Sequence, residues 1–337
     1  MTMTKQVLST ELDLLGILVN STLGLWDVPE NARATLINVS ENATYLVEAR
    51  DYKAVLRVHR PGYHSRRAIE CELAWSEALG AQAGVQTPAP YRGKNGEAVQ
   101  VRTLERLGEP RFMVLFEFID GTQPDEKKEL TGSFEELGAI AAQTHIHSMN
   151  WAKPQPFERL VWDTDAIFGP QAKWGNWRDA PNVTAPIRAI LERVEETIKA
   201  RLYRFGRGSN RYGLIHADMR LANLIINQNG TRLIDFDDCG MGWFLYDFAA
   251  SISFIEDHPQ VPALKAAWLR GYRQVRPISL EEEDEIDTFV MLRRLALLAW
   301  IGSHIDAPEP QAMAPHFATV SAELGDAYLG RFRGEGA

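Results

Sequence analysis

The side chains best suited to chemistry in this sequence gather in one short stretch. His216 and Asp218 lie two residues apart, and Asn223 follows five residues after the aspartate. Asp235 and Asp237 come next, at the end of an apolar run. Together they offer oxygen ligands for a hard cation and a carboxylate that can accept a proton, which are parts that phosphoryl transfer requires.

A predicted β-hairpin brings these residues together. The pair Asn229-Gly230, between two apolar runs, favours a two-residue type I′ turn. Counting outward from this turn, we expect Leu224 to face Asp235 across the hairpin. Asn223 and Asp235 then lie at the same open end, and Asp218 is in the loop that enters it. Three oxygen-bearing side chains therefore converge at one place.

Each of the three side chains has a separate task in that chemistry. Mg²⁺ prefers oxygen ligands and usually takes one or two carboxylates, so Asn223 and Asp235 are the candidate metal ligands. Another carboxylate must lie near the acceptor hydroxyl to orient it and accept its proton, and Asp218 fits that position. In the alternative interpretation, Asp218 and Asn223 cap turns and Asp235 ends a strand in solvent. Two motifs in this order, joined by a hairpin, favour the chemical interpretation.

The motifs HADMRLAN and LIDFDD resemble the signature of the aminoglycoside phosphotransferase and choline kinase family. That resemblance implies a kinase that uses ATP and Mg²⁺ and has the protein kinase fold. It implies that His216 supports the catalytic loop and that Asp218 is the catalytic carboxylate. It also implies that Asn223 and Asp235 bind the metal, with Asp237 assisting.

The elements that must position these residues change in kind along the chain. Short alternating runs over 35–58 predict an antiparallel meander, and a helix over 66–79 and a strand over 112–116 follow. Beyond Gly121 the apolar spacing becomes helical. It predicts helices over 134–149, 185–202, 262–274 and 281–301.

We therefore expect an α+β, protein-kinase-like fold with two lobes. Residues 1–120 would form a small antiparallel β-rich lobe that binds ATP and ends in a hinge. Residues 121–337 would form a larger, mainly helical lobe with the catalytic loop, the metal site and the acceptor pocket. The segment GWFLYDFA resembles a family segment whose acidic residue, here Asp247, is more structural than catalytic. His145 and His147 lie two residues apart, which favours packing or surface roles over metal binding.

Arg57 is the predicted phosphate anchor. Related enzymes carry a lysine on the third strand, and Arg57 stands at the matching position, with Lys53 as the competing candidate. An arginine fork can bridge phosphates, although arginine and lysine are not interchangeable. The partner glutamate should come from the following helix, where Glu72 falls on the apolar face. The alternative places Glu72 at the surface, paired with Arg66 or Arg67.

The remaining nucleotide contacts are expected from the same lobe. The loop SENAT contains no glycine, but its backbone amides and the hydroxyls of Ser40 and Thr44 can approach phosphate. By resemblance, backbone groups from Glu117 to Ile119 contact the polar edge of adenine.

Several segments are weaker candidates for the acceptor pocket. The acidic run 281–285 could attract a cation, but Ser279 and Glu282 form a capping box, which favours a solvated helix start. Arg220 could meet a phosphate, an acceptor carboxylate or a structural partner. Four tryptophans could wall a pocket, although aromatic residues more often fill a core; they are Trp151, Trp162, Trp174 and Trp177.

Composition argues against several other classes of protein. The net charge of -9 argues against binding to nucleic acid. Two cysteines, Cys71 and Cys239, are too few for a disulfide framework. The first residues do not read as a signal peptide, and no stretch reaches the length of a membrane span. We expect a cytoplasmic protein without a membrane partner.

Three functions stay open at this point. The leading one is a kinase for a small-molecule hydroxyl acceptor, which could be an amino alcohol, a hydroxy amino acid, a sugar or an aminoglycoside. A Ser/Thr protein kinase of bacterial stress-response type is the second, and the short interval between Asp238 and Tyr246 disfavours it. A nucleotide-binding pseudokinase is the third, and the intact Asp218, Asn223 and Asp235 disfavour it.

Overall fold

The computed structural model describes residues 2–39, 42–125 and 128–332. Two compact units divide the chain: unit 1 spans 1–81, 86–121 and 153–158, and unit 2 spans the rest. No helix in this described part combines the length and the apolar composition needed to cross a bilayer.

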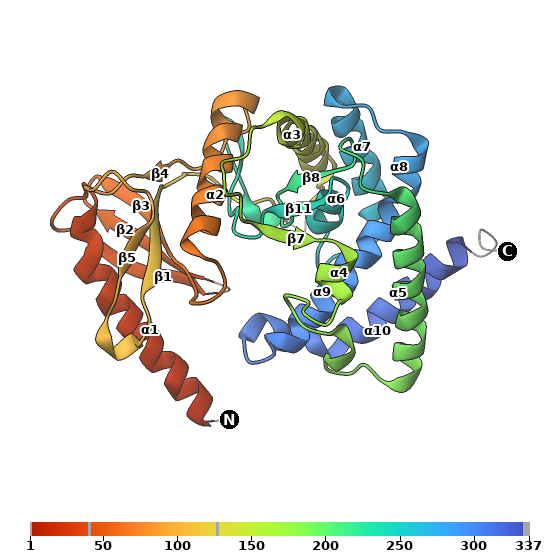
Figure 1. The fold of residues 1–337 in the computed structure, drawn as a ribbon, viewed down its shortest axis with the longest axis horizontal. Coiled ribbons are helices and arrows are strands. Elements are labelled where there is room, and N and C mark those ends of the chain that lie inside the picture. Colours follow the sequence, from red (N-terminus) through yellow and green to blue (C-terminus); the bar gives the residue numbers. More distant parts are fainter. Residues whose placement is uncertain (1, 40–41, 126–127, 333–337) are drawn as a thin grey trace. The chain divides into compact units, whose positions relative to one another are not determined.

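An antiparallel sheet forms the centre of unit 1, as Figure 1 shows. Its strand order is β1-β2-β3-β6-β4, with β5 also paired to β6. The predicted meander is confirmed, because β1, β2 and β3 are consecutive antiparallel neighbours. The strands are β1 Arg33–Val39, β2 Ala43–Ala49, β3 Tyr52–Val58, β4 Pro90–Tyr91, β5 Gln100–Arg102 and β6 Arg111–Glu117.

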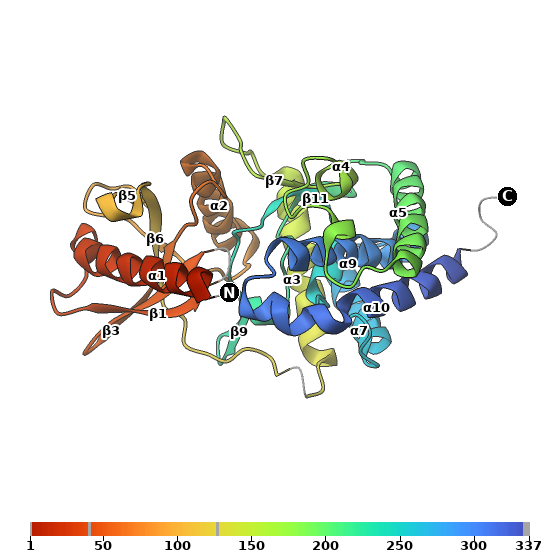
Figure 2. The same ribbon diagram turned by 90° about the horizontal axis from the view of Figure 1, so that it is seen from below.

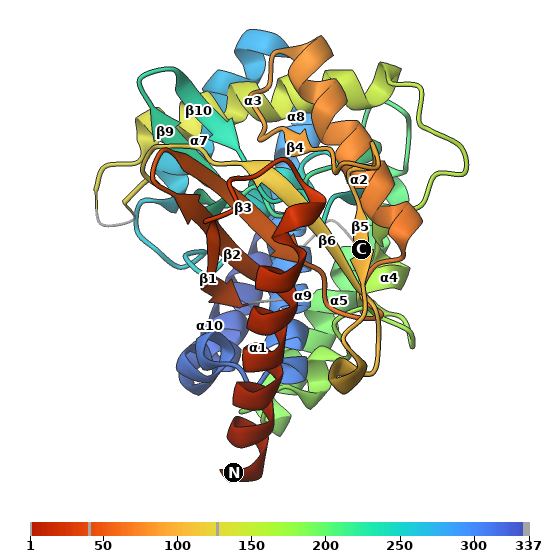
Figure 3. The same ribbon diagram turned by 90° about the vertical axis from the view of Figure 1, so that its left-hand side faces the viewer.

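The two helices of unit 1 cover opposite faces of this sheet (Figure 3). Leu18 and Val19 of α1 (Thr2–Thr22) pack in one cluster with Leu115 of β6. Ile69 of α2 (Arg66–Ala78) packs in a second cluster with Val114. Successive residues of a strand point to opposite faces, so the alternation along β6 requires this sandwich.

Unit 2 is mainly helical, and α9 packs against α5, α6 and α10. Figure 2 shows α9 beside α5 and α10. In the same unit, α3 packs along α7. The helices are α3 Thr131–Asn150, α4 Thr164–Phe168, α5 Ala185–Phe205, α6 Tyr246–Ser251, α7 Val261–Val275, α8 Leu280–Asp284, α9 Ile286–Ser303 and α10 Pro308–Arg331.

Two small sheets lie among these helices. β11 pairs in parallel with β7 and antiparallel with β8, and β9 and β10 form the predicted hairpin. The α+β class expected from the sequence is therefore confirmed. The strands are β7 Leu160–Trp162, β8 Tyr212–Ile215, β9 Leu224–Asn227, β10 Gly230–Leu233 and β11 Gly240–Trp243.

The predicted register of the hairpin was wrong by two residues. Leu224 faces Leu233 rather than Asp235. The Asn227 side chain accepts a hydrogen bond from the Asn229 amide at 2.8 Å, and this local turn closes the loop earlier than an Asn-Gly turn would. A slip of two residues keeps every side chain on its expected face.

The predicted helix over 281–301 is also corrected, because it is divided at Glu285 into α8 and α9. The predicted capping box between Ser279 and Glu282 is present and starts α8. The sequence interpretation assigned no element to α1 or α10, whose apolar residues lack strong periodicity. It also assigned none to the strands β7, β8 and β11, which are short.

Close approach of two backbones allows α3 and α7 to pack. A Cβ atom on Gly138 would lie 2.0 Å from the carbonyl oxygen of Trp268, and one on Gly271 would lie 1.7 Å from that of Glu135. Both distances are shorter than any real contact, so only glycine fits at these two positions.

We predict that Gly138→Ala destabilises the protein by about 2 kcal/mol or more, because the two helices must move apart to admit the methyl group. Gly132→Ala is the matched control on the same helix, since a Cβ there has no neighbour within 4 Å. Urea unfolding of both variants measures the difference. Equal stability of the two variants would show that the close approach has no energetic weight.

Candidate active site

A buried carboxylate fixes the backbone just before Asp218. Asp247, at the start of α6, accepts hydrogen bonds from the amides of His216 (3.2 Å) and Ala217 (2.7 Å). Ala217 has φ 65°, a left-handed conformation that is rarely adopted by residues with a β-carbon. The two hydrogen bonds from a fully buried carboxylate hold this strained turn. Asp247 therefore has the structural position expected from the sequence.

A chain of polar contacts reaches Asp247 from two further helices. Arg276, just after α7, donates to the Tyr272 hydroxyl at 2.9 Å, and that hydroxyl lies 2.9 Å from His145 Nδ1. His145 Nε2 lies 3.0 Å from an Asp247 carboxylate oxygen. Burial lowers the pKa of His145, and the neighbouring Asp247 only partly offsets this effect. The imidazole is therefore neutral, with its proton on the nitrogen that faces Asp247.

Three side chains hold the Asp218 carboxylate, which is 15% exposed. Arg293 Nη2 donates to one oxygen at 2.7 Å. Asn223 Nδ2 donates to the other oxygen at 2.7 Å, and Arg220 Nε approaches the same oxygen at 3.3 Å. Burial raises the pKa of the Asp218 carboxyl, but Arg220 and Arg293, together with His216 and Asn223, outweigh it and hold the pKa below its usual value. The group is a fixed anion.

His216 connects the loop to the strand that leads to Asp235. Its ring Nδ1 accepts a hydrogen bond from the Asp218 amide at 3.3 Å, and its Nε2 lies 3.1 Å from the carbonyl oxygen of Ile234. The Ile234 amide in turn donates to the carbonyl oxygen of Asn223 at 2.9 Å. The structure thus brings His216, Asn223 and the residue before Asp235 together despite the corrected register.

The residues around Asp235 have the chemistry of a magnesium site. Asn223 uses its amide nitrogen to hold Asp218, which leaves its Oδ1 for a cation; no hydrogen bond within the described ranges ends on that atom. Asp235 has φ 62°, in the left-handed region, and Asp237 is buried. The same ranges contain no cluster of three His, Cys, Asp or Glu. One amide with one or two carboxylates suits Mg²⁺, which keeps its other positions for water and phosphate.

The predicted phosphate anchor and its glutamate meet in unit 1. Arg57 Nη2 lies 2.5 Å from Glu72 Oε1, and both side chains are buried. Glu70, and not Glu72, pairs with the surface arginines of α2. Lys53 is exposed and lies over the Phe118 ring. The geometry therefore favours Arg57 over Lys53 as the anchor.

The other predicted nucleotide contacts lie near the same strands. Thr44 pairs with Arg57 across β2 and β3, whereas Ser40 lies outside the described residues. The Glu117 amide donates to the carbonyl oxygen of Ala89 at 2.9 Å. The Ile119 backbone, by contrast, takes part in none of the hydrogen bonds of the described segments.

A cavity of about 520 Å³ lies within unit 2, beside the catalytic loop. Arg220 links the two, because its Nη1 lies 3.7 Å from Glu309 Oε1 on the cavity wall while its Nε approaches Asp218. Arg294 is neutralised by Glu256 at 2.5 Å. The remaining polar and aromatic lining includes Ser253, Phe254, Asp257, His316 and Phe317.

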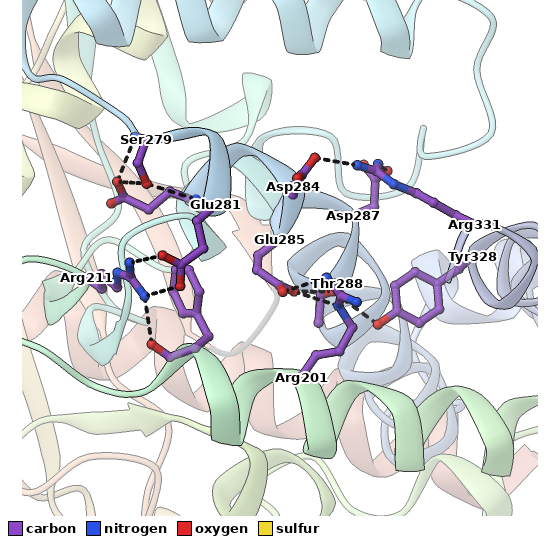
Figure 4. A network of polar contacts seen from close by, with 12 residues as sticks. Arg201, Arg211, Ser279, Glu281, Asp284, Glu285, Asp287, Thr288, Tyr328 and Arg331 are labelled. Carbon is purple, nitrogen blue, oxygen red and sulfur yellow. Dashed lines mark hydrogen bonds and ion pairs between the residues drawn. The ribbon is translucent and has the colours of Figure 1, made fainter. Parts of the chain in front are cut away.

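Among the weaker candidates, the acidic run 281–285 and three of the tryptophans have structural roles. Figure 4 shows that the acidic run 281–285 is tied to arginines: Glu281 pairs with Arg211, and Glu285 with Arg201. The expected helix start is therefore confirmed, but it is ion-paired rather than simply solvated. Among the tryptophans, three are buried in the core, namely Trp162, Trp174 and Trp177.

Arg293 and Glu309 were missed by the sequence interpretation. Arg293 stands beside a second arginine inside the otherwise apolar helix α9. Buried charges need partners, so this pair was the available signal. Glu309 lies in the first turn of α10 and has no local signal that separates it from an ordinary helix start.

The sequence profile of a phosphotransferase enzyme family matches residues 34–278. Homoserine kinase of Gluconobacter oxydans is 27% identical over 290 residues, covering 79% of this chain and 82% of the relative. A solved structure of a microcompartment-associated aminopropanol kinase is 40% identical, with a TM-score of 0.87, and covers 94% of this chain and 98% of that one.

An amicoumacin kinase structure, solved with AMP-PNP and Ca²⁺, is 20% identical, with a TM-score of 0.76, and covers 94% and 96% of the two chains. At this identity the likeness shows the fold alone. These kinase structures confirm the protein-kinase-like fold that the two sequence motifs predicted.

We predict that stability falls on acidification because of His145. Below about pH 6.5 an unfolded histidine binds a proton that the buried, pKa-depressed His145 excludes, so folding loses up to about 1.4 kcal/mol per pH unit. His145→Gln should flatten this dependence between pH 6.5 and 5. The exposed His258→Gln is the control. Parallel pH–stability curves for wild type and His145→Gln would contradict the prediction.

Proposed function

The chain belongs to the phosphotransferase enzyme family, and on this premise we propose that it transfers the γ-phosphate of ATP to the hydroxyl of a small amino alcohol. The observation that carries the proposal is the Asp218 carboxylate, fixed by Arg293 and Asn223 and linked through Arg220 to a cavity. ATP use follows from the kinase relatives.

The charge of the cavity supports a cationic acceptor. Four carboxylates lie in or beside the lining, namely Asp218, Glu256, Asp257 and Glu309, against the three arginines Arg220, Arg293 and Arg294, which leaves one net negative charge at the cavity. An amino alcohol has an ammonium group to meet this charge and a hydroxyl to receive phosphate. The 40% identical relative is named for aminopropanol, which has this chemistry.

Asp218 is the group that receives the acceptor hydroxyl. A loose phosphoryl-transfer transition state needs little covalent help, so orientation of the hydroxyl matters more than strong basicity. A depressed pKa suits this task because the group is ionised and accepts the hydrogen bond until the proton is transferred. The proton passes to Asp218 late, as the bond from the acceptor oxygen to the γ-phosphorus forms and the bond from that phosphorus to the oxygen of the leaving ADP breaks.

Asn223 and Asp235 would hold Mg²⁺, with Asp237 as a further carboxylate from the same segment. When bound, the metal neutralises charge on the phosphates. Arg159 donates hydrogen bonds to the carbonyl oxygens of Phe236 and Cys239, which lie on either side of Asp237 in the sequence. These bonds hold the backbone that carries Asp237.

We assign nucleotide binding to the lobe 1–120. Arg57, held by Glu72, contacts phosphate, and the hydroxyl of Thr44, which faces Arg57 across β2 and β3, adds a donor. The Ser40 hydroxyl is the further donor expected from the sequence. Backbone groups of Glu117 and Ile119 contact adenine. Because the Glu117 amide is already bonded to Ala89, that residue would use its carbonyl oxygen and Ile119 its amide.

We predict acceptor-dependent ATP consumption with Mg²⁺ and 1-amino-2-propanol or a related amino alcohol, above the rates with homoserine, a sugar, an aminoglycoside or a generic protein. Asp218→Ala should lower kcat by about 10²–10⁴-fold because the hydroxyl loses its orienting carboxylate. ATP affinity should persist. Turnover on none of these acceptors, or normal turnover by Asp218→Ala, would contradict the proposal.

Glu309→Gln should raise the KM for the amino alcohol by about tenfold, since a charge-assisted hydrogen bond to the ammonium is lost. The matched control is Glu323→Gln, an exposed residue on the same helix. With a diol of the same length the effect should vanish, because the diol has no cation. An unchanged KM for the amine would remove Glu309 from the acceptor site.

A further inference from the structure

The guanidinium group of Arg293 contacts the catalytic loop. It projects from α9, and its side chain is 2% exposed. One Nη donates to Asp218 Oδ1 at 2.7 Å, the other donates to the Ala217 carbonyl oxygen at 3.2 Å, and Nε donates to Ser253 Oγ at 3.1 Å. The five N–H donors of a guanidinium lie in one rigid plane, so three bonds fix its orientation.

Aromatic rings complete the surroundings of this cation. The centre of the guanidinium lies 5.3 Å from the Trp174 ring and 5.7 Å from the Tyr246 ring. Rings at these distances attract a cation, and they exclude water from it. Arg293 therefore has few alternative positions, and whatever it contacts is fixed with it.

Two of those contacts lie in the catalytic loop. Arg293 bonds to the side chain of Asp218 and to the carbonyl of the strained Ala217 just before it. Asp247 holds the amide of the same alanine. The two peptide groups that flank Ala217 are thus both held by side chains, and the carboxylate plane is set by Arg293 on one oxygen and Asn223 on the other.

Arg220 does not share this position. It is 29% exposed, lies 3.3 Å from Asp218, and divides its charge between Asp218 and Glu309. The cavity is lined by Arg220 and by Arg294 rather than by Arg293. Arg293 thus contacts Asp218 through Oδ1, whereas Arg220, which lines the cavity, approaches Oδ2.

We propose that Arg293 is a positioning residue for phosphoryl transfer: it fixes the Asp218 carboxylate in the orientation that receives the acceptor hydroxyl, without touching the acceptor. The inference rests on the proposed role of Asp218. It adds a residue from α9, distant in sequence from every motif that the resemblance carries.

The test compares Arg293→Lys with Arg201→Lys. Arg201 is another buried arginine of unit 2, and it bonds through Nε and Nη2 to Glu285, the residue between α8 and α9 (Figure 4). Both substitutions keep the charge and lose the planar fork. Steady-state kinetics with the amino alcohol, ATP affinity and the melting temperature are measured for both variants and for the wild type.

Arg293→Lys should lower kcat on the order of 100-fold with both KM values unchanged, because a misplaced carboxylate harms the reaction step and not binding. Arg201→Lys should lower the melting temperature to a similar degree with kcat near that of wild type. In case Arg293→Lys does not fold, Ser253→Ala removes the Nε contact and gives a milder loss of kcat; an unchanged KM for the amino alcohol separates this effect from the place of Ser253 in the cavity lining.

A wild-type kcat in folded Arg293→Lys, or an equal loss of kcat in Arg201→Lys, would overturn the inference. In case only Ser253→Ala folds, a wild-type kcat in that variant overturns it as well. Failure of the wild type to turn over any amino alcohol is a separate result, which would contradict the proposed function itself.

Discussion

A carboxylate keeps its charge inside a protein only where donors surround it. Unit 2 contains two such groups at one loop: Asp247, which has no exposed side-chain surface, and Asp218, which is 15% exposed. Asp247 fixes the backbone that precedes Asp218, and Arg293 fixes the carboxylate itself. His145 of α3 and Arg293 of α9 supply two of the donors, and Tyr272 of α7 holds His145, so the packing of these helices sets the geometry of the loop.

The contacts that hold Asp218 and Asp247 also stabilise unit 2, so the stability of the unit and the geometry of the candidate active site depend on the same side chains. Removing one partner of a buried ion pair costs about 3–5 kcal/mol, since the other charge is left uncompensated. His145 and Tyr272, which reach Asp247, stand on α3 and α7, and these helices approach closely only because Gly138 and Gly271 lack side chains. Small changes far from Asp218 can therefore reach it through a short series of contacts.

The local parts of the site were predictable from the sequence, and the long-range parts were not. Asp218, Asn223 and Asp235 lie close in sequence around a hairpin. The resemblance indicated a glutamate on the helix after Arg57, and helical spacing chose Glu72 over Glu70. The hairpin register failed because a side-chain hydrogen bond at Asn227 decides where the turn closes. Arg293 lies 75 residues from Asp218, and periodicity cannot report such a contact. Its only trace was a pair of charges in an apolar helix.

The central claim is that Asp218, held by Arg293 and Asn223, orients the acceptor hydroxyl. The most direct measurement is a crystal structure with Mg²⁺, a nonhydrolysable ATP analogue and an amino alcohol. We expect the hydroxyl oxygen at about 2.6–3.2 Å from an Asp218 carboxylate oxygen, with the bond to Arg293 intact. A hydroxyl bound to another side chain, with Asp218 turned away from it, would contradict the account.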